Sequence, residues 1–174
     1  KVIWLPSGLA QDPLHRGTIT GRYVGWGTGG HTDEFVRFAD ARTVLLAWAG
    51  EADMRRHPVA RLNQVRMQTN YEILSHSTDQ DGQPLRILKV PLPRTMDREV
   101  VLEAQEHYRP LGAWAASQFP AAEGRQPGDT LRQVAASSYL NHLVVNDLVL
   151  LPDYVPCGTP ARRQQEVRQI YQEA

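Results

Sequence analysis

Two stretches of this chain repeat one order of predicted elements, and that order limits the fold more than any other feature of the sequence. Residues 35–48 contain two strand-like runs separated by a short turn, which predicts a β-hairpin, and Pro58 then suits the first turn of a helix. A second predicted hairpin spans residues 138–151, and a second helix begins at Pro160. The repeated order of strand, strand and helix predicts an α/β fold built from repeated units.

The segments outside these repeats are less regular. Residues 2–5 and 85–90 have strand-like composition, and each run is ended by proline within a few residues. Residues 6–30 form a predicted long loop. Residues 94–136 form a predicted irregular connection in which residues 99–108 have helical character. We therefore expect one strand at residues 2–5, another at the end of the first unit, and little regular structure before the second unit.

The composition is that of a globular protein and excludes several classes of function. Of 174 residues, 41% are hydrophobic and 22% are charged. The 19 basic and 19 acidic residues cancel, so nothing supplies the positive field expected of a nucleic-acid binder. No apolar stretch is long enough to span a bilayer, and residues 1–6 lack the layout of a signal peptide. With a single cysteine, these features predict a cytoplasmic protein without a disulfide framework.

The most informative local feature is His31, two residues before Asp33 and directly after a glycine-containing segment at 27–30. In an extended strand, residues two apart share a face, so both side chains could flank one small planar ligand. An imidazole beside a carboxylate offers proton transfer near neutral pH and an anchor for a cation. The alternatives are a surface turn without function and part of a metal site, although no neighbouring ligand cluster is visible.

Several segments, in order, resemble signatures of the agmatine deiminase and bacterial (Porphyromonas-type) peptidyl-arginine deiminase family. The first are Val2-Ile3-Trp4-Leu5-Pro6 with Gly8-Leu9-Ala10, Gly30-His31-Thr32-Asp33 with Arg37-Phe38, and Leu45-Leu46-Ala47-Trp48. The later ones are Tyr71-Glu72-Ile73-Leu74, Asp79-Gln80-Asp81-Gly82 before Ile87-Leu88-Lys89-Val90-Pro91-Leu92-Pro93, and Ser138-Tyr139-Leu140-Asn141. The resemblance extends over residues 1–174 and is weakest in 94–136.

The resemblance implies a pentein α/β propeller, which has five ββαβ units around a pseudo-fivefold axis. We expect residues 1–174 to be a partial pentein domain that holds about two of these units. Residues 1–30 would end a preceding unit and add a long loop, and residues 31–93 would form the first ββαβ unit. Residues 94–136 would be the irregular connection, and residues 137–174 a truncated second unit. The chain begins without Met and ends within a predicted helix, so we interpret it as a piece of a longer enzyme.

The resemblance also implies the hydrolysis of a guanidino group to a ureido group and ammonia, through a cysteine thiouronium intermediate and without a cofactor or metal. Carried over by position, His31 is the general acid and base, and Asp33 binds the guanidinium cation. Asn141 and Trp26 are candidate substrate contacts. The expected substrate is agmatine, as in putrescine and polyamine biosynthesis, or the arginine of a C-terminal arginine peptide; we expect no nucleic acid or membrane partner and leave a homo-oligomer open.

Two parts of the family's machinery have no counterpart in this sequence. The family nucleophile is a cysteine that ends a glycine-rich segment near the C-terminus, and its first carboxylate lies in an N-terminal segment with Trp and Asp. Cys157 does not match that position, and we expect it to be a loop cysteine without a catalytic role. The isolated chain is therefore predicted to be inactive as a deiminase.

Plainer interpretations stand beside the functional ones. Asn141 could be an ordinary polar strand residue, and Trp26 could be part of the loop surface. Residues 79–82 resemble a calcium loop but lack its remaining ligands, so we predict a turn. Trp4 and Trp48 are predicted core residues. The alternative functions are another guanidine-modifying pentein, namely an arginine deiminase or amidinotransferase, and a guanidinium-binding domain without catalysis.

Overall fold

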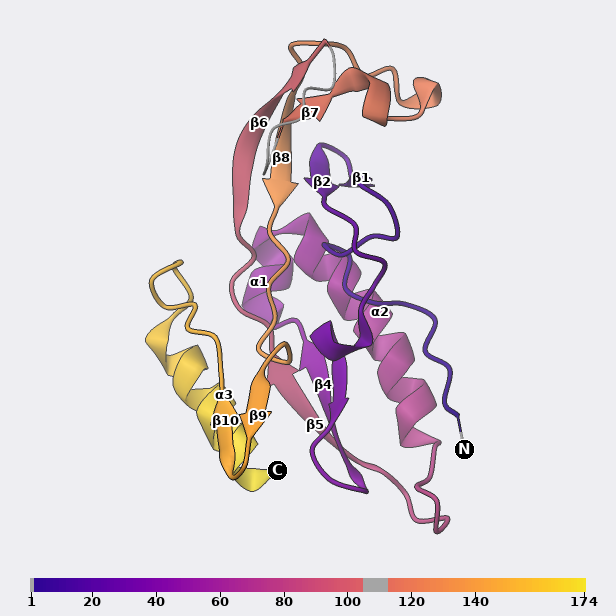
Figure 1. Cartoon of the computed structure of the whole chain (residues 1–174), viewed down its shortest axis with the longest axis vertical. Coiled ribbons are helices and arrows are strands. Elements are labelled where there is room, and N and C mark those ends of the chain that lie inside the picture. Colours follow the sequence, from indigo (N-terminus) through magenta and orange to yellow (C-terminus); the bar gives the residue numbers. More distant parts are fainter. Residues whose placement is uncertain (1, 105–112) are drawn as a thin grey trace.

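The computed structural model describes residues 2–104 and 113–174. Two sheets follow one another along the long axis of the molecule (Figure 1). The first has three strands in the order β3-β4-β5 and is packed against helices, and the second has five strands in the order β1-β2-β8-β6-β7. A separate two-stranded sheet is formed by β9 and β10. The chain is therefore a mixed α/β structure, as the sequence predicts.

The three-stranded sheet contains the strands predicted in residues 35–48 and 85–90. Strand β3 (Val36–Phe38) pairs antiparallel with β4 (Thr43–Trp48), and β4 pairs in parallel with β5 (Arg86–Pro91). The crossover between β4 and β5 contains α1 (Glu51–Arg56) and α2 (Pro58–Ser75). A parallel pair requires such a long connection, and helix α2 begins with proline where its missing N–H costs nothing. The short helix α1 was not expected from the sequence.

The main core lies between this sheet and its helices. Strand β4 is buried from Thr43 to Ala47, as its continuous apolar sequence predicts. Helix α2 adds Met67 and Leu74, and α3 (Ala161–Glu173) adds Val167, which is fully buried. Trp48 packs against this core while remaining partly exposed, in agreement with its predicted place.

The five-stranded sheet corrects two predictions. The loop predicted over 6–30 contains a hairpin of β1 (Gly17–Thr20) and β2 (Tyr23–Gly25). The segment 94–136 contains β6 (Asp97–Glu103), β7 (Trp114–Ala115) and β8 (Thr130–Val134), with two short 3-10 turns, η2 (Ala116–Gln118) and η3 (Ala121–Glu123). The helix predicted over 99–108 is wrong for residues 99–104, which form the end of β6 and a bend, and residues 105–108 lie outside the described residues. These strands form because β8 pairs with both β2 and β6, which a local pattern does not reveal.

The strand predicted at residues 2–5 is also wrong. No strand is assigned there, and the side chain of Trp4 is 85% exposed, so Trp4 is not a core residue. The same segment leads into Leu9 and Ala10, which are buried. Ile3 and Leu5 pack against the main core, but the run forms no strand because no strand pairs with it among the described residues.

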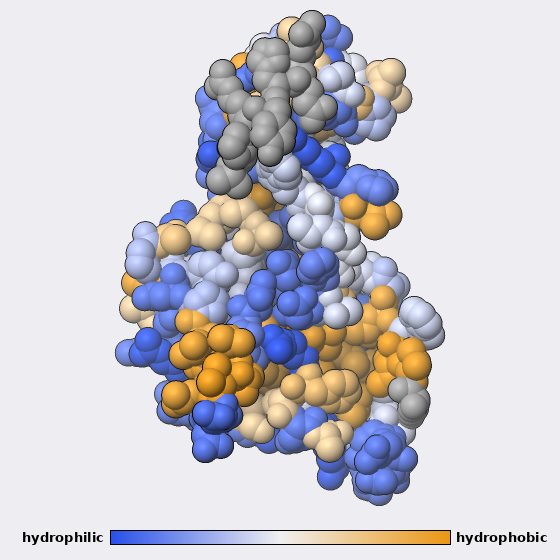
Figure 2. Space-filling view, viewed as in Figure 1, coloured by the Kyte–Doolittle hydropathy of each residue, from blue (hydrophilic) through white to orange (hydrophobic). Residues whose placement is uncertain are grey.

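The second predicted hairpin is confirmed in its later half. Strand β9 (Leu143–Val145) pairs antiparallel with β10 (Leu148–Leu150), and Asn146 adopts a positive φ of 53° in the turn between them. Residues 138–142 precede β9 without forming a strand. All six strand residues are apolar and exposed, and they form an apolar patch in Figure 2. This hairpin therefore presents hydrophobic surface to solvent in the described part of the chain.

Candidate functional site

The glycine-containing segment before His31 packs directly against residues 12–15. A side chain at Gly27 would place its Cβ 2.2 Å from the Pro13 carbonyl oxygen, so only glycine fits there. Gly29 and Gly30 have positive φ values of 106° and 71°, which glycine adopts without strain. The backbone N–H of Gly29 donates to the Pro13 carbonyl at 3.3 Å. The glycines therefore let the chain turn closely around the residues that carry the next contact.

Asp12 is the buried group that fixes this turn. One carboxylate oxygen accepts from the backbone N–H of Thr28 at 2.7 Å and from the Thr28 hydroxyl at 2.6 Å. The other oxygen accepts from the backbone N–H of His31 at 2.9 Å. Burial alone would raise the pKa of Asp12, but the hydrogen bonds from Thr28, His31 and Gly30 outweigh burial and lower that pKa. Asp12 therefore carries a negative charge at neutral pH and holds His31 by its backbone.

His31 and Asp33 lie side by side, but not in the strand that the spacing suggested. His31 precedes a single 3-10 turn, η1 (Thr32–Glu34), whose N–H groups close on the carbonyls of His31 and Thr32. The turn brings the His31 Nδ1 atom to 3.8 Å from an oxygen of Asp33. Their side chains are 58% and 49% exposed. The pair is thus open to a ligand from solvent, with the imidazole and carboxylate on the same side of the turn.

Glu34 is a third acidic group in this turn. One of its carboxylate oxygens is buried and accepts no hydrogen bond from the described residues. Burial raises the pKa of Glu34, and repulsion from Asp12 and Asp33 adds to this, while His31 acts in the opposite direction. Folding therefore disfavours the charged form of Glu34, which lies directly beside the His31/Asp33 pair.

Replacing Glu34 with glutamine should stabilise the chain more at pH 7 than at pH 4. A carboxyl whose pKa is raised by folding stabilises the folded state below its unfolded pKa, and that contribution is lost as the pH rises through its folded pKa. Glutamine has no such loss. Melting temperatures of wild type and Glu34→Gln between pH 4 and 8 will test this, with Glu166→Gln on an exposed helix position as the control. If the two proteins differ in melting temperature by the same amount at every pH, folding does not raise the pKa of Glu34.

Asn141 is held close to the strand that follows η1. The Nη1 atom of Arg37 on β3 donates to the carbonyls of Leu140 at 3.3 Å and His142 at 2.8 Å. These two carbonyls flank Asn141, whose side chain is exposed. Arg37 therefore fixes the backbone on both sides of Asn141 against the element that follows the His31/Asp33 pair, and the role of Asn141 in binding stays a prediction.

The side chain of Trp26 contacts residues other than the His31/Asp33 pair. Its ring lies 6.2 Å from the ring of Trp114, and the guanidinium of Arg16 lies 4.1 Å from the centre of the Trp26 ring. No contact joins Trp26 to His31 or Asp33 among the interactions of the described residues. The predicted substrate contact of Trp26 thus stays untested, and its observed contacts are with the second sheet.

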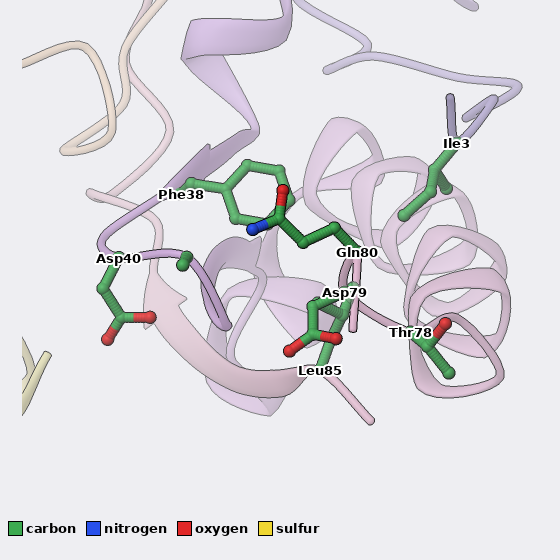
Figure 3. A pocket seen from close by; sticks show the side chains of 8 residues that line it. Ile3, Phe38, Asp40, Thr78, Asp79, Gln80 and Leu85 are labelled. Atoms are coloured by element: carbon green, nitrogen blue, oxygen red, sulfur yellow. The ribbon is translucent and has the colours of Figure 1, made fainter. Parts of the chain in front are cut away.

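Cys157 makes no contact with His31 or Asp33 among the interactions of the described residues, and neither residue of the pair lines the cavity at the β3–β4 turn. Cys157 is exposed and belongs to a turn in which its N–H donates to the Tyr154 carbonyl. A cavity of about 390 Å³ lies at the end of β3 that is remote from η1, and Figure 3 shows its lining from the β3–β4 turn and residues 78–85. Its two carboxylates, Asp40 and Asp79, accept backbone N–H groups of their own turns. Residues 79–82 accordingly form the turn that the sequence predicts.

The sequence pattern identified His31 and Asp33, but it did not identify Asp12 and Glu34 beside them. Asp12 lies 16 residues from Thr28 and 19 from His31, so no spacing rule links them. Glu34 follows Asp33 directly, and its burial depends on tertiary packing. Within residues 2–104 and 113–174, no three His, Cys, Asp or Glu side chains gather to hold a metal ion, and no described helix could cross a membrane.

Several known proteins are similar to this chain in sequence and in fold. A family model described as Porphyromonas-type peptidyl-arginine deiminase matches residues 1–174. The agmatine deiminase of Pseudomonas aeruginosa (strain LESB58) is 29% identical over 154 residues, which cover 88% of this chain and 32% of that protein. The agmatine deiminase of Stutzerimonas stutzeri (strain A1501) is 27% identical over 175 residues, which cover 99% and 37% respectively. The chain thus spans about a third of the length of these relatives.

A solved structure supports the fold. The agmatine deiminase of Enterococcus faecalis superimposes with a TM-score of 0.54 over 98% of this chain and 36% of that chain, at 21% sequence identity. At that identity the likeness concerns the fold, whereas the family model depends on sequence along the whole chain. The chain belongs to the Porphyromonas-type peptidyl-arginine deiminase family.

Proposed function

We propose that this chain supplies the cation-binding and proton-transfer part of a guanidino-group deiminase. The observation that carries the proposal is the exposed His31/Asp33 pair, held by Asp12 at the start of η1. A carboxylate binds a planar guanidinium through charge-assisted hydrogen bonds, each worth about 1.5–3 kcal/mol. An imidazole within reach of the same group can give and accept a proton near neutral pH.

In the proposed reaction, Asp33 holds the guanidinium cation beside the His31 ring. A cysteine thiolate from the rest of the enzyme attacks the guanidinium carbon, and the C–N bond breaks as His31 gives a proton to the departing ammonia. His31 then takes a proton from water, whose oxygen forms the ureido group as the S–C bond breaks and the thiolate leaves. This scheme places acid and base catalysis on one imidazole, in agreement with the one histidine of the turn.

The proposed substrate is agmatine, with peptidyl-arginine as the second member of the same class. Relatives named agmatine deiminase support this choice, together with the family model. We also propose that the domain is part of a five-unit pentein propeller. Strands β3 to β5 with α1 and α2 would form one ββαβ unit, and β9, β10 and α3 would begin another. The order of elements in Figure 1 supports this division.

The purified chain should bind agmatine and should not release ammonia from it. Because Asp33 would supply the charged contact, Asp33→Asn should weaken binding at least about tenfold, which corresponds to about 1.4 kcal/mol and lies below the value of one such hydrogen bond. Titration calorimetry measures the binding, and an ammonia assay measures turnover. Asp147→Asn, at an exposed position in the β9–β10 turn, is the matched control.

Two results would contradict the proposal. Unchanged agmatine binding in Asp33→Asn would remove Asp33 from the site, and ammonia release that is lost in Cys157→Ala would make Cys157 the nucleophile. Binding that depends on Asp33 in a protein whose intact native form never releases ammonia would instead support a guanidinium-binding domain without catalysis.

A further inference from the structure

The side chain of Arg16 lies in a corner formed by two tryptophans. Its guanidinium carbon is 4.1 Å from the ring centre of Trp26 and 4.1 Å from that of Trp114. The two rings are inclined at 70°, so they form two walls of a corner around the cation. The Nη2 atom of Arg16 also donates to the carbonyl of Ala113. The corner therefore offers two aromatic faces and one hydrogen-bond acceptor to a planar cation.

One wall of this corner is fixed and the other is open. Trp114 is fully buried, stacks on Phe119 with ring centres 5.6 Å apart, and packs with Leu102 and Leu131 in the core of the second sheet. Trp26 directly follows β2 and is 40% exposed. A ligand could thus approach past Trp26 and meet a wall already held in place by the core, which lowers the cost of ordering the site.

The chemistry of the corner selects guanidinium over ammonium. A guanidinium is planar and weakly hydrated, so it stacks on indole and still donates hydrogen bonds at its edge. Each cation–π contact contributes about 0.5–2 kcal/mol, with the larger values where the cation is desolvated. A compact, strongly hydrated ammonium gains less from the same faces because it must first lose its water. The corner therefore suits an arginine side chain or another monoalkyl guanidinium.

We propose that Trp26, Trp114 and the Ala113 carbonyl form a second guanidinium-binding site, which Arg16 fills and which a free monoalkyl guanidinium takes when the Arg16 side chain is displaced. This site is separate from the His31/Asp33 pair and does not depend on deiminase activity. Arg16 acts as a tethered ligand, so a free ligand must compete with an effective concentration in the millimolar range.

Removal of the tethered ligand should reveal the site. Methylguanidinium is titrated into wild type and Arg16→Ala up to about 20 mM, and intrinsic tryptophan fluorescence is recorded, with methylammonium as the matched cation. We expect a saturable change in Arg16→Ala, with a dissociation constant on the order of 1 mM, and binding weaker by about a few-fold in wild type, where Arg16 competes at a millimolar effective concentration. Methylammonium should give no saturable change in either protein.

Two further variants make the result specific. Arg16→Ala combined with Trp26→Leu should lose the methylguanidinium response, and Arg16→Ala combined with Asp33→Asn should keep it, which separates this site from the His31/Asp33 pair. Far-ultraviolet circular dichroism checks that each protein is folded, and Arg16→Gln replaces Arg16→Ala if alanine prevents folding. A folded Arg16 variant that does not distinguish methylguanidinium from methylammonium, or a response that survives Trp26→Leu, would overturn the proposal.

Discussion

Replacing Asp12 with alanine should lower the free energy of unfolding by about 3 kcal/mol and should abolish agmatine binding. The substitution removes three hydrogen bonds to a charged acceptor and leaves the backbone N–H groups of Thr28 and His31 without their partner. For a chain of this length, such a loss corresponds to a melting temperature lower by about 6–12 °C. Calorimetric melting and agmatine titration measure the two effects.

The control for Asp12 is an aspartate without such contacts. Asp147→Ala lies in the exposed β9–β10 turn and should change the stability by less than about 0.5 kcal/mol. Asp12→Asn keeps the shape of the side chain but loses its charge, so it should lie between alanine and wild type. If Asp12→Ala has the same melting temperature as Asp147→Ala and still binds agmatine, the Asp12 carboxylate does not hold the loop of His31.

Asn63→Ala should be comparably destabilising, by about 3 kcal/mol, because the Asn63 side chain makes two buried hydrogen bonds between α2 and the segment before Asp12. Its Oδ1 accepts from the backbone N–H of Ala10 at 2.7 Å, and its Nδ2 donates to the side-chain oxygen of Gln11 at 2.7 Å. Asn63 is 1% exposed, so alanine leaves both partners buried without replacement. Chemical denaturation followed by circular dichroism measures the change.

An amide on the same helix provides the comparison for Asn63. Gln68 is exposed and bonds only Glu72 on its own helix among the interactions of the described residues. Gln68→Ala should therefore be nearly neutral, since alanine favours the helix slightly. Equal stabilities of the Asn63 and Gln68 variants would mean that the hydrogen bonds of Asn63 add little to those that Arg66 and Asn70 make to the same segment.

Elements with a strong local signal were predictable from the sequence. Helix α2 has proline at its first turn and a long apolar periodicity, and the hairpin of β9 and β10 has Asn146 in its turn. The second sheet was not predictable, because β2 finds its partner β8 about a hundred residues later, with Tyr23 opposite Arg132. A three-residue strand has too little pattern to identify itself, and only pairing in the folded chain stabilises it.

The candidate site likewise has some features that the sequence shows and others that only the folded structure shows. His31 and Asp33 are visible in the sequence because they are two residues apart and follow glycines. Their 3-10 turn was not predictable, since it depends on the distant Asp12 accepting the N–H of His31. The burial that raises the pKa of Glu34 is likewise a property of packing. Local sequence thus predicts candidate groups for the chemistry, whereas tertiary contacts set the geometry of the turn and raise the pKa of Glu34.

The exposed β9–β10 hairpin favours association between copies of the chain in solution. Its six apolar side chains are 41–65% exposed, and neither strand pairs with any further strand among the described residues. Open strand edges with apolar faces are templates for association, and the balanced charge of the chain, with an isoelectric point near 7.2, provides no net repulsion at neutral pH. We therefore expect dilution, and a buffer well away from this isoelectric point, to reduce association of the chain.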